Sequence, residues 1–258
     1  MKTLVLFIAL FKKSWAGFRR YIFETVSGIV TLFLFFLALF FGLKTLAAGA
    51  PGLGGTLDAI VVGYIVWTLA IFTYFSLAQS LIQEAQLGTL EQVAMSPFGL
   101  SKVVLAEVAA GLVFQFMMLA VLLVCMMAVT GKWLHMDLLS IIPIALMTVG
   151  GVVGLSMVMG GLAVVFKRVQ SALQIMQMVF IALVAIPVSH FTWIKYMPLA
   201  WGNSLLRRVM VNGDSLLTIP VRDSLFLFAH MVAYLVVGTI VFRYFERIAR
   251  ARGLLGHY

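Results

Sequence analysis

The sequence predicts an all-α polytopic membrane protein with six transmembrane helices in one domain, residues 1–258. Of its 258 residues, 63% are hydrophobic and only 10% are charged, and the mean hydropathy of +1.12 is far above that of a soluble domain. Several apolar runs reach the roughly 20 residues that a helix needs to cross a bilayer core. The single cysteine, Cys125, lies in one such run, so no disulfide can form within the chain.

Residues 1–23 are predicted to form an amphipathic helix that lies in the membrane interface and binds lipid. Apolar residues recur there at helical spacing: Ile8, Phe11, Trp15, Phe18 and Ile22. Basic residues occupy a different face: Lys12, Lys13, Arg19 and Arg20. The alternative is that this segment is simply the start of the first span. It lacks the small-residue cleavage site of a signal peptide.

Six apolar segments are predicted to span the membrane: 25–46, 57–82, 104–130, 138–166, 170–189 and 224–244. An even number of spans places both termini on the same side of the membrane. With the termini inside, twelve of the 18 Lys and Arg residues are cytoplasmic and six are outside. The positive-inside rule therefore predicts cytoplasmic termini, and a cytoplasmic connection between the second and third spans.

Residues 190–223 are predicted to form one or two short re-entrant or interfacial helices in the outer leaflet. Charges interrupt this segment every few residues, which argues against a seventh span. The aromatic residues Trp193, Tyr196 and Trp201 fit an interfacial belt. Asn203 is expected to cap a helix that begins at Ser204 and ends near Asn212-Gly213.

The fifth span carries a polar stripe formed by Gln170, Gln174 and Gln177, which share one helical face. Such a stripe should face protein or water, so it predicts either hydrogen bonds between helices or the wall of a translocation path. In the fourth span, Gly150 and Gly154 form a Gly-x-x-x-Gly pair that permits close helix packing.

The sequence contains no recognisable motif for catalysis, nucleotide binding or metal binding. There is no Gly-x-x-x-x-Gly-Lys-Ser/Thr loop for nucleotide phosphates, and the four histidines lack metal-ligand spacing. We therefore expect no catalytic site, no cofactor and no metal in this chain. The net charge of +9 is attributed to basic cytoplasmic segments beside anionic lipid, and no nucleic-acid partner is expected.

The most informative segment, residues 84–102, lies between the second and third spans. Glu84 and Glu91 are seven residues apart, so on one continuous helix they would share a face. Thr89 and Gln92 fit a capping box after the turn-forming Gly88, and Ser96-Pro97 predicts a second helix start. The alternative is a solvated linker. Three helix signals favour a short polar helix on which a partner protein could act.

Glu84, Gly88-Thr89-Leu-Glu91, Ser96-Pro97 and Lys102 resemble the motif of ABC exporter permeases of the type-2 membrane class. The outer segment from Met197 to Arg207 resembles the looser outer-loop pattern of that family. The chain departs from the family at Ala85-Gln86, which is neutral where a charged pair is frequent.

The resemblance implies a transmembrane subunit of an ATP-driven exporter in a prokaryotic cytoplasmic membrane. Residues 84–98 would be the coupling helix, seated on one of two soluble ATPase subunits that bind ATP and Mg. A second permease copy, as a homodimer, would complete a path for an amphipathic drug, a lipid or a lipid-linked glycan. Two other classes remain open: an ion-gradient-driven secondary carrier, and a non-transporting membrane assembly protein.

Overall fold

The computed structural model describes residues 2–47, 54–166, 169–186, 188 and 192–253, and over these residues the chain is all-α. The elements are α1 (Lys2–Arg20), α2 (Ile22–Ala47), α3 (Gly54–Gln86), α4 (Leu90–Ala94), α5 (Leu100–Thr130), α6 (Leu138–Val165), α7 (Gln170–Ala185), the 3-10 helix η1 (Thr192–Tyr196), α8 (Ala200–Asn212) and α9 (Val221–Ala251). The predicted fold class, an all-helical multi-pass membrane protein, is confirmed at this level.

Among the described residues, five helices are long and apolar enough to cross a membrane: α2, α3, α5, α6 and α9. The fifth predicted span, 170–189, is shorter in the structure. Helix α7 has 16 residues, about 24 Å at 1.5 Å per residue, against a bilayer core of about 30 Å. It ends because Ile186 is extended, with ψ of 122°. Residues 187 and 189 of the predicted span lie outside the described residues.

Two of the long helices extend well beyond the predicted spans. The second predicted span, 57–82, is part of a helix that runs to Gln86, and the last, 224–244, is part of a helix that runs to Ala251. The added turns carry polar side chains. Hydropathy detects the membrane core, whereas backbone hydrogen bonding continues into water as long as the residues tolerate a helix.

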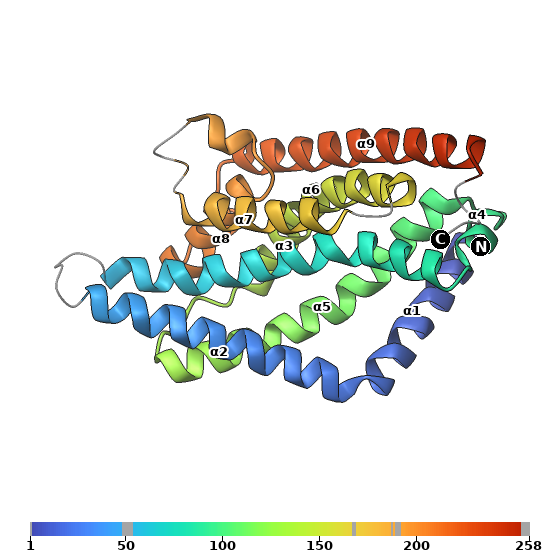
Figure 1. Cartoon of the computed structure of the whole chain (residues 1–258). Helices are drawn as coiled ribbons and strands as arrows, with labels where there is room; N and C mark the ends of the chain where they lie inside the picture. Colours follow the sequence, from blue (N-terminus) through green and yellow to red (C-terminus); the bar gives the residue numbers. More distant parts are fainter. Residues whose placement is uncertain (1, 48–53, 167–168, 187, 189–191, 254–258) are drawn as a thin grey trace.

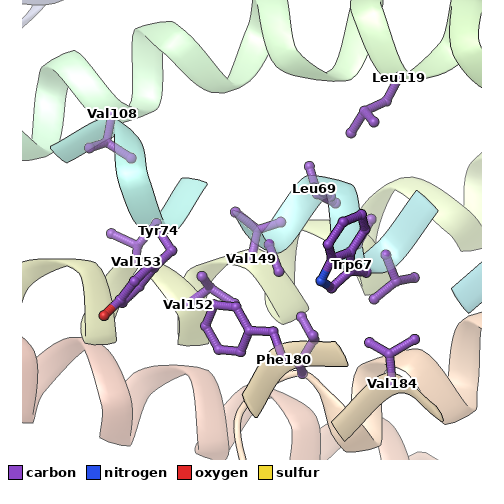
Figure 2. Close-up of a cluster of buried hydrophobic side chains, with 14 of the residues drawn as sticks. Trp67, Leu69, Tyr74, Val108, Leu119, Val149, Val152, Val153, Phe180 and Val184 are labelled. Atoms are coloured by element: carbon purple, nitrogen blue, oxygen red, sulfur yellow. The ribbon is translucent and has the colours of Figure 1, made fainter. Parts of the chain in front are cut away.

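The long helices run side by side (Figure 1), and α6 packs most extensively against α9 and α3. The start of α1, helix α4 and the end of α9 lie together at one end of the bundle, and α8 lies at the other. Figure 2 shows the interior, where side chains of α3 meet those of α6 and α7. Tyr74 and Phe180, both fully buried, pack edge to face with ring centroids 5.3 Å apart.

Glycines set the close contact between α6 and α9. A Cβ added to Gly154 would lie 2.2 Å from the backbone oxygen of Tyr234, and one added to Gly238 would lie 2.1 Å from the oxygen of Gly154. One turn earlier on α6, a Cβ on Gly150 would lie 2.5 Å from Cγ of Met231. Gly150 and Gly154 therefore belong to a contact in which the two backbones approach directly.

The predicted outer helix begins earlier than expected. Helix α8 starts at Ala200, after Leu199 in a left-handed conformation with φ of 78°. Asn203 is therefore not its cap, and its side-chain amide instead donates to the carbonyl of Val184, 3.1 Å away. The end of the helix is as predicted, since Gly213 terminates it in the left-handed conformation with φ of 79°. Residues 190–191 lie outside the described residues.

Candidate docking site at one end of the bundle

The segment 84–98 is not one continuous helix, because the chain turns at Gly88. Gly88 has φ of 70°, and its N–H donates to Ala85 while the N–H of Thr89 donates to the carbonyl of Glu84. These two bonds form a Schellman motif that ends α3. Helix α4 then has only five residues. Glu84 and Glu91 consequently belong to different helices and do not share a face.

The predicted capping box is wrong. Thr89 precedes α4, but no side-chain cap bond is made, and its φ of −96° and ψ of −8° are already helical. The Thr89 hydroxyl instead donates to the Glu84 carboxylate. A hydrogen bond to an ionised carboxylate is stronger than one between neutral groups, and it orients the hydroxyl toward Glu84.

The second predicted helix start is also wrong. Ser96 and Pro97 occupy a turn closed by the N–H of Gly99, which donates to the carbonyl of Ser96 at 3.0 Å. Pro97 takes the second position, for which its fixed φ is suited. Gly99, with φ of 74°, then leads into α5 at Leu100. The two turns hold α4 as a short rigid elbow between α3 and α5.

A lysine from α1 joins the acids of α3 and α5 beneath this elbow. Lys13 Nζ lies 3.0 Å from Oε1 of Glu84 and 3.1 Å from Oε1 of Glu107. The other oxygen of Glu107 accepts a hydrogen bond from the Ser80 hydroxyl at 2.8 Å. Both carboxylates are mostly shielded, with 21% and 25% of their side chains exposed. The cluster ties three helices together at the base of α4.

Lys13 remains charged in this cluster. Its partial burial would lower the pKa, but the charge of Glu107 and the hydrogen bonds to both glutamates outweigh burial and raise the pKa above its ordinary 10.5. A raised pKa means that pairing stabilises the fold fully below the unfolded pKa, and that this contribution is lost only as pH rises through the folded value. Lys13 therefore stays protonated throughout neutral pH.

The last helix holds α4 from its other side. Arg250 Nη2 donates to the carbonyl of Ala94 at 3.2 Å and to Oε1 of Glu246 at 2.6 Å. Glu246 is buried at 9% exposure, and its second oxygen accepts from the Ser101 hydroxyl at 3.1 Å. Helix α4 is thus fixed to α9 as well as to the cluster around Lys13. Glu246 and Arg250 were not predicted as site residues, although their spacing of four residues in a polar segment was a usable signal.

The outer face of the elbow presents two apolar side chains around an acid. Leu87 and Met95 are each 72% exposed, and Glu91 between them is exposed without an ion pair among the described residues. The inward residues Leu90 and Ala94 are buried. Residues Leu87, Glu91 and Met95, called the elbow face below, form a small surface that a protein partner could bind.

The segment predicted as an interfacial helix, 1–23, is helical as α1, which ends at Arg20, and Ile22 begins α2. Aromatic side chains of α1 pack around Phe114 of α5, with centroid distances of 5.1 Å from Phe11 and 5.9 Å from both Trp15 and Phe18. Three further basic residues of α1, Lys12, Arg19 and Arg20, are exposed. Helix α1 therefore lies on α5 and carries a charged outer surface.

The glutamine stripe of α7 lies largely on the surface of a single chain. Gln170 accepts from Nε2 of Gln79 on α3, at 3.4 Å. Gln174 is exposed and Gln177 is half-buried. The structure thus pairs one member with a neighbouring helix and leaves Gln174 facing outward, where lipid alone would be an unfavourable neighbour.

Among the described residues, no group of three His, Cys, Asp or Glu side chains could hold a metal ion. Fold and site together define a multi-pass helical membrane protein with a rigid polar elbow at one end. No family model matches the chain, and a search of curated proteins found no significant match.

Replacing Lys13 with Gln is expected to loosen α1 with only a modest loss of global stability. The lysine is 56% exposed, so two such pairs contribute about 1 kcal/mol. Partial trypsin digestion, which can cut at Lys12 and Arg19, should release α1 faster in this variant. Lys12→Gln, an exposed neighbour, is the matched control, and equal digestion of both variants would contradict the role of the cluster.

Proposed function

We propose that this chain is the transmembrane subunit of an ATP-driven exporter, and that the elbow face is where a soluble ATPase binds. The observation that carries the proposal is a five-residue helix that is exposed on one side, packs on the other against α3 and α5, and is held to α9 by the hydrogen bond from Arg250 to Ala94. A solvated linker needs no such anchoring. Movement of α4 would be transmitted directly to α3, α5 and α9, and to α1 through the ion pairs of Lys13 with Glu84 and Glu107.

In this proposal, ATP and Mg belong to the partner subunit. ATP binding by two such subunits would draw their bound elbows together, and hydrolysis would release them. The four anchored helices would follow, which would open the path alternately to the two sides. The roles of the two acids differ: Glu84 transmits force through Lys13, and Glu91 contacts the ATPase.

The proposed assembly is a homodimer with a six-crossing topology in a prokaryotic cytoplasmic membrane. Helix α7 would complete its crossing together with η1 and α8 in the outer leaflet, and both termini and the elbow would be cytoplasmic. The exposed basic residues of α1 at the elbow's end support this orientation. The outward Gln174 supports a second copy facing α7, where the glutamines would line a path for an amphipathic substrate.

The test is co-purification in mild detergent. We expect a soluble ATPase to elute with the permease at two copies each and to hydrolyse MgATP. Replacing Leu87 and Met95 with Glu should abolish co-elution, because two charges would enter an apolar contact. Leu217→Glu, at a leucine that is 95% exposed in the connection from α8 to α9, is the control.

Retained co-elution of the Leu87→Glu, Met95→Glu double variant would refute the elbow face as the ATPase site. Glu84→Gln with Glu91→Gln should leave the permease folded and stop transport, so normal transport by that variant would refute coupling. Transport by the permease alone in liposomes, driven by an ion gradient, would identify a secondary carrier instead. A partner ATPase that no substrate stimulates would favour an assembly protein.

A further inference from the structure

The end of the bundle opposite the elbow contains a half-buried cation, Arg207 of α8, between two cavities. One cavity, of about 330 Å³, has a mixed polar and apolar lining that includes Asn203, Ser204 and Arg208. The other, of about 220 Å³, is apolar and is lined from α2, α3 and α7. Its lining includes Phe35, Leu39, Tyr64, Trp67 and Ile181.

The charge of Arg207 is not balanced within the described residues. Its neighbour Arg208 takes both nearby acids, at 3.0 Å from Asp214 and 3.5 Å from Asp223, and no carboxylate pairs with Arg207 there. A guanidinium that is shielded from water without a counter-charge is costly.

A structural role for Arg207 accounts for only part of its hydrogen-bonding capacity. Its Nη2 donates to the carbonyl of Val184 at 3.0 Å, where a cation suits the last turn of α7. The same carbonyl already accepts from Asn203 at 3.1 Å. A guanidinium has five N–H donors in a fork that matches carboxylate and phosphate oxygens.

Two buried donors at this place lack acceptors. The Nε of Arg207 and the indole Nε1 of Trp67 are each buried without a hydrogen-bond partner, and both residues line the apolar cavity. Buried donors are normally satisfied, so each unpaired one needs an explanation. For the guanidinium of Arg207, a ligand that brings acceptor oxygens would provide that explanation.

We propose that this site binds an amphipathic anion, with a phosphate or carboxylate head at Arg207 and an apolar tail in the cavity beside Trp67. Arg208 and Asn203 would face the head from the larger cavity. The identification of this ligand as a transported substrate rests on the proposed function. The binding of the ligand to this site does not depend on that function. The proposal narrows the substrate class from amphipathic molecules in general to anionic ones.

The test measures binding to the permease alone, in nanodiscs of neutral phosphatidylcholine, with empty nanodiscs correcting for partitioning. The probes are dodecyl phosphate, dodecyl maltoside and inorganic phosphate, and the signal is tryptophan fluorescence, because Trp67 lines the cavity. We expect saturable binding of dodecyl phosphate only. Equal binding of the neutral maltoside would overturn the role of the cation, and equal binding of inorganic phosphate would overturn the role of the tail.

Arg207→Gln should weaken dodecyl phosphate binding about tenfold or more, as expected for loss of a charged hydrogen-bond donor. Arg222→Gln, which removes an exposed charge at the start of α9, should not change it. Unchanged affinity in Arg207→Gln would overturn the proposal. If that variant does not fold, the affinity of the native protein for butyl phosphate is measured instead. An affinity equal to that for dodecyl phosphate would refute a site that binds the apolar tail.

Two further measurements distinguish a resident membrane lipid from a transported substrate as the ligand of this site. Competition by phosphatidylglycerol in the nanodisc, with no stimulation of the partner ATPase, would place a resident anionic lipid at Arg207. Stimulation of the ATPase by dodecyl phosphate, lost in Arg207→Gln, would make the anion a substrate. Binding without any co-purified ATPase would leave the site standing and refute only the proposed function.

Discussion

Gly154→Ala is expected to disrupt folding of the bundle, although it adds a single methyl group. The new Cβ would lie 2.2 Å from the oxygen and 2.3 Å from the carbonyl carbon of Tyr234. Both obstacles are backbone atoms, so no change of rotamer relieves the clash and α6 must move away from α9. Overpacking of this kind costs about 1–3 kcal/mol or more. Thermal unfolding and size-exclusion chromatography in detergent should report a lower Tm and aggregation.

Gly160 and Gly28 provide the controls. At Gly160 the obstacle is the Cδ2 atom of Leu77, 1.9 Å away, so Gly160→Ala should be rescued by Leu77→Ala. At Gly28 of α2 nothing lies within 4 Å, and alanine there should be neutral or slightly stabilising, by up to about 1 kcal/mol. A Gly154→Ala protein as stable as Gly28→Ala would contradict the direct backbone contact.

This contact also illustrates what the sequence could predict. The pair Gly150 and Gly154 marks a small-residue face by its spacing alone. Its partner, Gly238, stands alone in α9 with no motif around it, so nothing in the sequence indicates which helix meets that face. Local spacing is visible in a sequence, whereas the choice of neighbour depends on how all the helices pack together.

The same distinction between local spacing and the choice of neighbour applies to α4 and its flanking turns. The polar composition of residues 84–98 between apolar runs predicts a short helix there, and five of these residues, Leu90–Ala94, form one. The predicted caps fail because each depends on which group a hydroxyl meets: Thr89 finds the carboxylate of Glu84, and Ser96 opens a turn. The pairing of Glu84 with Lys13 joins residues 71 apart in the chain. Long-range pairs of this kind become visible only in three dimensions.

The long apolar helices were the most predictable part, because a bilayer imposes both a length and a composition. The polar extensions of these helices were not predicted, because the hydropathy of the sequence falls at the polar residues that follow each apolar run. One of these extensions carries Glu246 and Arg250, which hold α4 to the last helix.

Arg250→Gln is expected to impair both stability and coupling, for two separable reasons. Glu246 is buried at 9% exposure and would lose its counter-charge, which costs up to about 3 kcal/mol, reduced here because the Arg250 side chain is 48% exposed. The carbonyl of Ala94 would also lose its donor, so α4 would no longer be held to α9. Tm and vanadate-sensitive ATP hydrolysis of the co-purified complex measure the two effects independently.

Adding Glu246→Gln to Arg250→Gln separates these effects. The double variant carries no buried unpaired charge, so its Tm should recover most of the loss. It still lacks the bond to Ala94, so substrate-stimulated ATP hydrolysis should remain low. Arg247→Gln, on the exposed side of the same turn, should alter neither measurement. Recovery of both stability and coupling in the double variant would mean that Arg250 only neutralises Glu246, and that force passes from α4 to the bundle through Lys13 and its two glutamates alone.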